Sequence, residues 1–294
     1  MLSCCTLCPR NCGVDRTNNV AGFCGALDDV KIARAALHFW EEPCISGKNG
    51  SGTVFFSCCN MKCVYCQNYE ISTLNKGRAI TILELSDTFL FLQEEGAHNI
   101  NLVTPTHFVP QIICALDEAK RRGLTLPVVY NSGGYESIET IRLLKGYVDI
   151  YMPDMKYFSD KYAVKYSLAP NYFNISKAAI DEMFNQVGKP VFDENGIMQK
   201  GMIVRHMMLP GLLFDSKKII DYLYNTYKDD IYISLMSQYT PLPHTKDFPE
   251  LSKKLNPLHY EAMVDYCAEL GICNAFVQDG EAASESFIPP FEWE

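Results

Sequence analysis

Three cysteines close together, Cys59, Cys63 and Cys66, constrain this chain more than any other feature of its 294 residues. They are separated by three and then two residues, and they follow a strand-like run at residues 53–57. Thiolates that lie close together in a loop bind soft metals, and cysteine thiolates hold 4Fe-4S clusters. Three protein ligands leave one iron of such a cluster without a protein ligand. The motif therefore predicts a metal centre at which a small molecule can bind.

The alternatives are a zinc knuckle and a run of buried structural cysteines, because free cysteine is among the most buried residue types. Zinc sites usually contain two closely spaced Cys or His pairs with a longer spacer between them. No such second pair follows, since Cys114, Cys267 and Cys273 are scattered. Cys58 could replace Cys59 as a ligand, but only Cys59 gives the spacing of three and two. We therefore favour a cluster over zinc.

A second group of four cysteines lies within twenty residues near the amino terminus: Cys5, Cys8, Cys12 and Cys24. Four thiols can bind zinc or an auxiliary iron-sulfur cluster, and the sequence does not choose between them. The segment is rich in turns and poor in apolar periodicity, so we expect it to need a cross-link to offset its ordering entropy. The alternative is reduced thiols in a segment held by the packing of Leu7, Val14 and Phe23.

Composition and charge predict a globular protein without a nucleic-acid surface. The chain is 48% apolar, enough for one large domain and a small appendage. The net charge of −9 makes a broad nucleic-acid-binding surface unexpected. No apolar signal segment follows Met1, and no window approaches the ~20 apolar residues that span a bilayer. We therefore expect a cytoplasmic protein with reduced cysteines and no membrane contact.

From residue 52 onward, strand-like and helix-like runs alternate. The expected strands are residues 53–57, 99–104, 126–131, 147–152, 202–209, 231–236 and 274–278. The expected helices are residues 82–95, 110–122, 138–144, 178–187, 216–227 and 257–270. This alternation predicts an α/β fold with a parallel sheet. A glycine-rich run at residues 47–52 divides the chain into a cysteine-rich segment, residues 1–50, and a main domain, residues 51–294.

Polar side chains gather at or just after the ends of the expected strands, where parallel barrels place their sites. Each of these side chains alone is weak evidence for a site, because an Asp and a Lys that lie close together are usually a surface pair, which contributes little to stability. Their joint placement predicts a binding site. The candidates are Thr104, Thr106, Asn131, Ser132, Asp154, Lys156 and Arg205.

The three-cysteine motif, with the aromatic Tyr65 before its last cysteine, resembles the signature of the radical S-adenosylmethionine (SAM) superfamily. The resemblance implies a partial (β/α)6 TIM-like barrel, a 4Fe-4S cluster on Cys59, Cys63 and Cys66, and SAM bound to the open iron. It also implies that Tyr65 packs near the adenine. The reduced cluster would cleave SAM, and the 5'-deoxyadenosyl radical would abstract hydrogen from a substrate.

Over nearly its whole length the chain resembles the pyruvate formate-lyase activating enzyme-related branch of that superfamily. The matching stretches are Cys5-Thr-Leu-Cys8-Pro9-Arg10, Trp40-Glu41-Glu42-Pro43, Thr104-Pro-Thr-His107, Asp154-Met-Lys156 and Val204-Arg205-His206. Asp154 and Lys156 match residues that contact SAM or a nearby cation, and Arg205 matches an arginine of the pocket. In the activases a Gly-Gly-Glu binds the SAM amino group. Here Thr104-Pro-Thr106 stands in its place, so hydroxyls or carbonyls would hold that group.

The resemblance implies an electron donor of the flavodoxin or ferredoxin type. The first candidate reaction is installing a glycyl radical on a protein partner, and the second is modifying a peptide or a small metabolite. Two other classes remain as alternatives: a non-catalytic iron-sulfur electron carrier and a zinc-stabilised interaction protein. A large barrel favours an enzyme over both.

Overall fold

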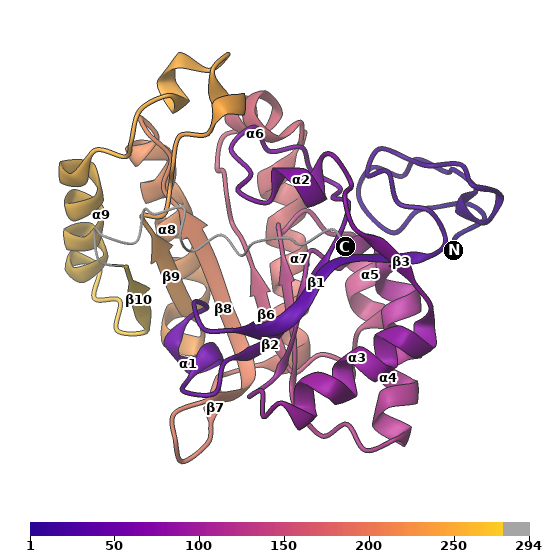
Figure 1. Cartoon of the computed structure of the whole chain (residues 1–294). Helices are drawn as coiled ribbons and strands as arrows, with labels where there is room; N and C mark the ends of the chain where they lie inside the picture. The colour runs from indigo at the N-terminus through magenta and orange to yellow at the C-terminus, as the bar shows by residue number, and fades with distance from the viewer. Residues whose placement is uncertain (279–294) are drawn as a thin grey trace.

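The structure is a computed structural model that describes residues 1–278, and a curved, mostly parallel sheet forms its centre (Figure 1). The strand order is β10-β9-β8-β6-β5-β4-β2-β1-β3. The parallel strands are β2 (Ser51–Phe56), β4 (Ile100–Val103), β5 (Val128–Ser132), β6 (Ile150–Pro153), β8 (Met198–Met207), β9 (Tyr232–Met236) and β10 (Ala275–Val277). All seven predicted strands are present, and the α/β fold with a partial TIM-like barrel is confirmed.

Helices cover the convex face of the sheet (Figure 1). They are α3 (Ile82–Glu94), α4 (Val109–Arg121), α5 (Ile138–Leu143), α7 (Tyr172–Val187), α8 (Leu213–Tyr227) and α9 (Pro257–Glu269). Helix α6 (Asp160–Ser167) lies instead beside Lys62 and Val64, whose backbone amides donate to carbonyls at its end. The start of α3 is fixed by a capping box, in which Thr81 accepts from the Glu84 amide while the Glu84 carboxylate accepts from the Thr81 amide. None of the helices within residues 1–278 has the length and apolar character that crossing a membrane requires.

Residues along each strand alternate between two environments, as a period of two requires. Tyr130 and Tyr151 point outward into the core that the sheet shares with the helices. Val129, Ile150 and Ile203 point inward and form a separate apolar layer inside the barrel. The core therefore lies on both faces, and the inner layer closes the barrel below the level of the site.

The inner layer is completed by residues 39–50, the connection that links β1 (Val30–His38) to β2. Because His38 pairs with Ser51, the connection leaves β1 at the amino-terminal end of the barrel strands. Its short helix α1 (Pro43–Ser46) places Cys44 and Ile45 against the inward side chains of β5, β6 and β8. The connection thus forms a floor inside the barrel.

Strand β1 pairs antiparallel with β2 on one side and with β3 (Arg78–Ile80) on the other. The division into residues 1–50 and 51–294 stays a prediction, but its boundary falls between two paired strands, β1 and β2. A further short strand, β7 (Val191–Phe192), forms a hairpin with β8. The first 29 residues, here called the amino-terminal loops, contain one short 3-10 helix, Arg16–Asn18.

Candidate functional site

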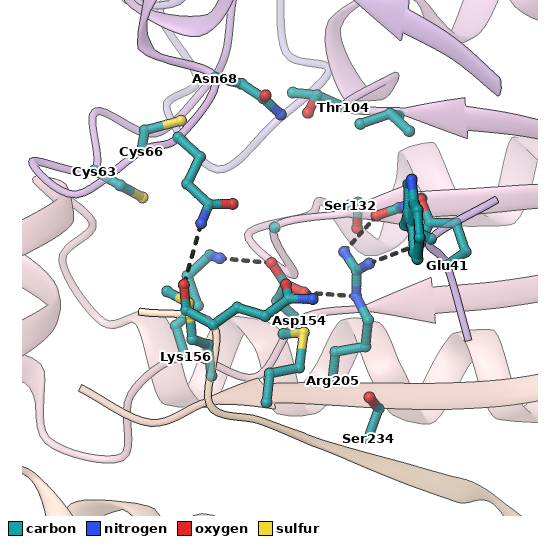
Figure 2. Close-up of a pocket in the computed structure, with 18 of the residues that line it drawn as sticks. Glu41, Cys63, Cys66, Asn68, Thr104, Ser132, Asp154, Lys156, Arg205 and Ser234 are labelled. Carbon is teal, nitrogen blue, oxygen red and sulfur yellow. Dashed lines mark hydrogen bonds and ion pairs between the residues drawn. The ribbon is translucent and has the colours of Figure 1, made fainter. Parts of the chain in front are cut away.

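A pocket of about 690 Å³ opens at the carboxyl ends of the parallel strands (Figure 2). Its lining includes the three thiols of the motif, Cys59, Cys63 and Cys66. All three belong to the cysteine loop, residues 57–68, which runs from the end of β2 to the short helix α2 (Tyr69–Ser72). The local spacing and the strand before it therefore place three potential ligands at one side of one cavity.

Each of the three sulfurs has a hydrogen-bonding neighbour. The Met61 amide donates to Cys59 Sγ at 3.4 Å, and Ser167 Oγ donates to Cys63 Sγ at 3.0 Å. Cys66 Sγ lies 3.2 Å from Ser72 Oγ. Hydrogen bonds to sulfur stabilise negative charge and tune the potential of a bound cluster. Burial raises the pKa of the Cys59 and Cys66 thiols, so a cation or cluster is needed to hold them as thiolates.

Cys58 faces away from the pocket. Its side chain is 1% exposed and packs in the core between the sheet and the helices, where burial raises its pKa to about 11. Its backbone has a φ of +74°, which turns the chain so that Cys59 instead reaches the pocket. Three thiols with sulfur hydrogen bonds fit a 4Fe-4S cluster with one open iron. The structure therefore supports the register that uses Cys59.

Tyr65 lies beside the thiols at the start of a chain of hydroxyl groups. Its OH is 2.6 Å from Tyr157 OH, which is 2.7 Å from Ser167 Oγ. Because Ser167 donates to Cys63 Sγ, its oxygen can accept from Tyr157, and Tyr157 can accept from Tyr65. Tyr65 also lines the pocket, as its expected place near the adenine requires.

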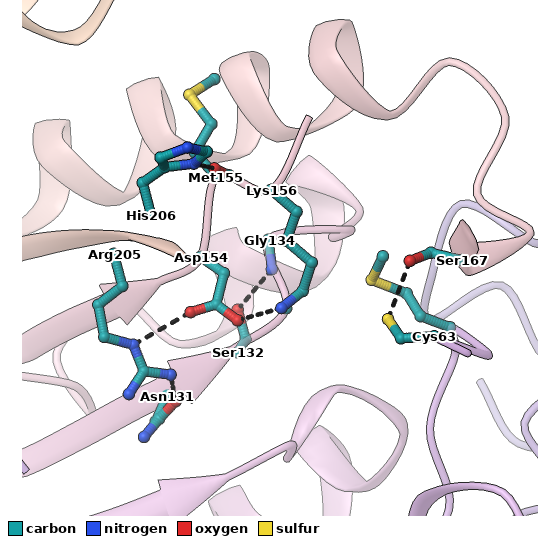
Figure 3. A network of polar contacts seen from close by, with 12 residues as sticks. Cys63, Asn131, Ser132, Gly134, Asp154, Met155, Lys156, Ser167, Arg205 and His206 are labelled. Atoms are coloured by element: carbon teal, nitrogen blue, oxygen red, sulfur yellow. Dashed lines mark hydrogen bonds and ion pairs between the residues drawn. The ribbon is translucent and has the colours of Figure 1, made fainter. Parts of the chain in front are cut away.

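A row of alternating charges crosses the pocket below the thiols (Figure 3). Lys156 Nζ lies 2.5 Å from Asp154 Oδ2, and Arg205 Nε lies 3.0 Å from Asp154 Oδ1. Arg205 also reaches Glu41 Oε2 at 3.2 Å and Asn131 Oδ1 at 2.6 Å. Burial opposes the charge on Asp154, but the two cations outweigh it and keep its pKa below the ordinary value. Asp154, Lys156 and Arg205 are thus a partly buried network that lines the pocket, not the solvated surface pair of the alternative.

Of the predicted hydroxyl and amide residues at the ends of β4 and β5, three line the pocket and one does not. Thr104, Asn131 and Ser132 line the pocket. Thr104 has a φ of +60°, a strained value for a β-branched residue, and strain of this kind gathers at functional sites. Contrary to the expectation that it contacts SAM, Thr106 does not reach the pocket. Its Oγ1 instead donates to Glu136 at 2.7 Å behind the wall.

The sequence reasoning missed two acidic residues and a serine. Glu41 and Glu42 rise from the connection into the pocket, and Ser234 lies on β9 at the same level. Glu41 pairs with Arg205 and accepts from Asn101 Nδ2, which is 3.2 Å away. The signal that could have found the pair is two adjacent carboxylates between Trp40 and Pro43.

The four amino-terminal cysteines lie apart from the pocket lining. Cys5, Cys8 and Cys24 are buried, whereas Cys12 is exposed. Burial raises the pKa of both Cys8 and Cys24. Within the part of the chain that the structure describes, no three His, Cys, Asp or Glu side chains are arranged around a single metal ion, and this includes the three pocket thiols. A 4Fe-4S cluster has a different requirement, because each thiolate binds a separate iron.

The comparisons with known proteins agree with this geometry. A family model described as the radical SAM superfamily matches residues 53–223. The chain belongs to the radical SAM superfamily. An uncharacterised protein of Methanocaldococcus jannaschii, MJ0674, is 28% identical over 261 residues, which are 85% of this chain and 70% of the relative.

Two solved structures resemble this chain at low sequence identity, and the first of them shows the same type of fold. One is SuiB of Streptococcus suis bound to its precursor peptide SuiA, at a TM-score of 0.50 and 13% identity. The match covers 75% of this chain and 46% of SuiB, so this chain spans less than half of that protein. The other is methylornithine synthase, at a TM-score of 0.44 and 16% identity, with 74% of this chain and 68% of that one covered.

Proposed function

We propose that this protein cleaves SAM reductively and uses the resulting radical to take a hydrogen atom from a substrate in the pocket. The observation that carries the proposal is the convergence of three thiols and a partly buried charged network on one cavity. Members of the superfamily are enzymes. When bound and reduced, the cluster supplies the electron that splits SAM into methionine and a 5'-deoxyadenosyl radical.

The residues of the chain then have separate tasks. Cys59, Cys63 and Cys66 would hold the cluster, with Ser167, Ser72 and the Met61 amide donating to their sulfurs. Lys156 extends from Asp154 toward Cys63, whereas Arg205 pairs with Asp154 from the side away from Cys63 (Figure 3). Lys156 is therefore the group best placed to pair with the SAM carboxylate.

Thr104, Asn131 and Ser132 offer hydroxyl and amide groups for the rest of SAM. Asn131 Oδ1 is already held by Arg205, which fixes the orientation of its amide. Asp154 in turn holds Lys156 and Arg205 in place through both carboxylate oxygens. The protein therefore supplies a preorganised polar wall, and preorganisation of this kind lowers the cost of binding.

Two reactions fit this machinery, and we place activation of a glycyl-radical partner first. Its support is the Asp154-x-Lys156 and Arg205 match to the pyruvate formate-lyase activating enzyme-related branch. The second candidate is modification of a peptide side chain or a small metabolite. It is favoured by the closed floor of the barrel, because a pocket that ends on Glu41 and Glu42 suits a side chain or a small molecule.

The electron donor we propose is a flavodoxin or ferredoxin in a reducing cytoplasm. An electron carrier without catalysis, or a zinc-stabilised interaction protein, would not need SAM. A visible spectrum of the anaerobically purified protein separates zinc, which is colourless, from an iron-sulfur cluster. Incubation with SAM and dithionite should then release 5'-deoxyadenosine. A coloured protein that leaves SAM intact under these conditions contradicts the proposal.

We also propose a structural zinc ion or an auxiliary cluster at Cys5, Cys8, Cys12 and Cys24. The support is the amide of Ala26, which donates to Cys24 Sγ at 3.4 Å, together with the burial of three of the four thiols. Binding requires these thiols to move closer together. Metal analysis of a variant with the three pocket cysteines changed to Ala tests this. About one zinc or about four irons per chain supports a site, and folded protein with neither rejects it.

A further inference from the structure

One carboxylate in the pocket has an oxygen without a partner. Glu42 is 8% exposed and lines the cavity from the floor that the connection forms. Ser234 on β9 lies close enough to its side chain to lower the pKa of the carboxyl, but Oε2 has no hydrogen-bond partner among the described residues. A buried carboxylate oxygen that remains unpaired is costly, so such a group in a cavity indicates a ligand that completes it.

The two cations of the pocket are already engaged by other carboxylates. Lys156 pairs with Asp154, and Arg205 pairs with Asp154 and Glu41. Three carboxylates therefore face two cations, and Glu42 is the one without a contact to either. Burial raises the pKa of Glu42, and the neighbouring charge of Glu41 raises it further while Arg205 opposes both. A positive group placed at Oε2 would lower the pKa of Glu42 and favour the ionised carboxylate.

The strand wall beside Glu42 is mostly apolar. Met207 on β8, Met236 on β9 and Phe276 on β10 line the cavity there. The polar residues of this wall are Arg205 on β8, Ser234 on β9 and Gln278 directly after β10. The groups we assign to SAM, Ser132 and Lys156, come from the other side, at the ends of β5 and β6. The pocket thus offers a second compartment with a largely apolar wall and, at its base, one buried carboxylate oxygen without a hydrogen-bond partner among the described residues.

We propose that this compartment binds a substrate with a basic nitrogen on an apolar stem, a primary ammonium or a guanidinium, and that Glu42 is its counter-ion. The inference rests on the proposed function, because it makes this compartment the substrate side of the pocket. The same chemistry is offered by a lysine or arginine side chain of a peptide and by a free alkylamine. A charge-assisted hydrogen bond to Glu42 would orient the stem, so that a carbon along it faces the SAM compartment.

The test is calorimetric titration of the full chain, anaerobically loaded with its cluster and with SAM. One arm uses Nα-acetyl-lysine N-methylamide against its neutral counterpart, Nα-acetyl-6-hydroxynorleucine N-methylamide. The other arm uses n-pentylamine against 1-pentanol. We expect the amine to bind at least tenfold more tightly than the alcohol in one arm or both, and the arm with the larger ratio identifies a peptide or a small-molecule source.

Replacing Glu42 by Gln keeps the shape and removes the charge, so the ratio should fall to within about twofold of one. Glu94→Gln, on the exposed side of α3, is the matched control and should keep the full ratio. Equal affinity for amine and alcohol in the unchanged protein, or no amine binding in either arm, overturns the proposal, whether or not the Glu42 variant folds. An unchanged ratio in folded Glu42→Gln overturns it as well.

Failure of this inference and failure of the proposed function give different results. Dithionite-driven cleavage of SAM, measured without any amine, reports only on the proposed function. Cleavage without amine preference rejects the cation site alone. Amine preference that depends on Glu42 in a protein that cannot cleave SAM rejects the enzyme and keeps the site.

Discussion

The cysteine loop and the amino-terminal loops both concentrate cysteines, yet the surroundings of these cysteines differ. Three thiols of the cysteine loop, those of Cys59, Cys63 and Cys66, face a cavity of about 690 Å³, and two of them accept hydrogen bonds from Ser167 and the Met61 amide. Those of the amino-terminal loops lie outside that cavity, and Cys8 and Cys24 are packed against protein. Spacing alone marks both as potential ligands. Only an adjoining cavity with polar walls turns a ligand set into a reaction site.

The amino-terminal loops are held in place by a buried arginine. Arg16 is 1% exposed, and its guanidinium donates to Leu27 O and to His107 O, the latter at 2.5 Å. Leu7 is buried as well, and its carbonyl accepts from Thr140 Oγ1 at 2.8 Å. Phe23 is 38% exposed, so it contributes less than we expected. Hydrogen bonds from buried side chains therefore provide cross-links that we had assigned to a metal alone.

The two regions are also joined directly. Arg10 Nε donates to Asn60 O at 2.9 Å, and Asn60 Nδ2 donates to Tyr135 O at 2.6 Å. The guanidinium of Arg10 lies over the Phe23 ring, 3.7 Å from its centre. The amino-terminal loops thus contact the cysteine loop at Asn60, the residue after Cys59, and help to hold it in place.

The largest expected effect separates the two thiols at the start of the cysteine loop. Cys59→Ala removes a ligand and should abolish both the cluster absorbance and 5'-deoxyadenosine formation. Cys58→Ala shortens a core side chain outside the pocket and should keep both, at a stability cost of about 1 kcal/mol. A Cys58 variant without iron beside a Cys59 variant that keeps it would reverse the register.

A substitution in the charged row of the pocket should have the next largest effect. Asp154→Ala leaves Lys156 and Arg205 without a shared partner, and breaking a buried pair costs roughly 3–5 kcal/mol. SAM affinity, measured by equilibrium binding, should fall at least tenfold. Asp87→Ala is the control, because its pair with Arg122 is exposed and worth about 1 kcal/mol or less. Unchanged SAM affinity in Asp154→Ala would remove this residue from the SAM site.

The arginine of the amino-terminal loops should matter for stability more than for catalysis. Arg16→Met leaves the carbonyls of Leu27 and His107 unsatisfied, for a loss of about 3 kcal/mol in the free energy of unfolding. Urea denaturation measures that loss, and limited proteolysis should detect earlier release of the amino-terminal loops. Arg121→Met, on an exposed side chain, should change neither. If the Arg16 variant is as stable as the wild-type protein, Arg16 is not the cross-link of these loops, and a metal would have to provide it.

The smallest effect concerns Glu136, a buried carboxyl that accepts from Thr106 and Tyr130. Burial raises its pKa to about 7, against hydrogen bonds from Thr106, Ser132 and Tyr130. A carboxyl with a raised pKa in the folded state stabilises the fold below its unfolded pKa, and that contribution is lost as pH rises through about 7.

The wild-type protein should therefore lose on the order of 2 kcal/mol more between pH 5 and 8 than Glu136→Gln, in urea titrations at each pH. Taking the difference between the two proteins cancels the other titrating groups. Parallel profiles for the two would mean that Glu136 stays ionised in the fold.

The sequence predicted those features that depend on local residue patterns. The seven parallel strands were found because buried strands read as continuous apolar runs, and the register of Cys59 followed from spacing. The short strands β3 and β7 were missed because two or three residues carry no period. Helix α6 was missed because its residues, Asp160–Ser167, are largely polar. These elements take their structure from the neighbours they pair with or pack against.

The site was predicted less completely, and the reason is the path of the chain. Asp154, Lys156 and Arg205 were found because parallel strands bring their carboxyl ends to one edge. Glu41 and Glu42 precede the first parallel strand, and nothing local indicates that residues 39–50 turn into the barrel. Thr106 was placed in the pocket because of its sequence position, whereas the 3-10 turn at Thr106–Phe108 directs it behind the wall.

That turn of the chain into the barrel has a practical consequence. The base of the cavity is made by twelve residues, 39–50, that are joined to the barrel at both ends, while Asn131 and Arg205 lie on the strands β5 and β8 and Asp154 directly follows β6. Exchanging this one short insert would give the cavity a different depth and a different charge, and it would also replace Glu41, the partner of Arg205. Replacement of residues 39–50 is therefore a direct way in which the same barrel could come to bind a different molecule.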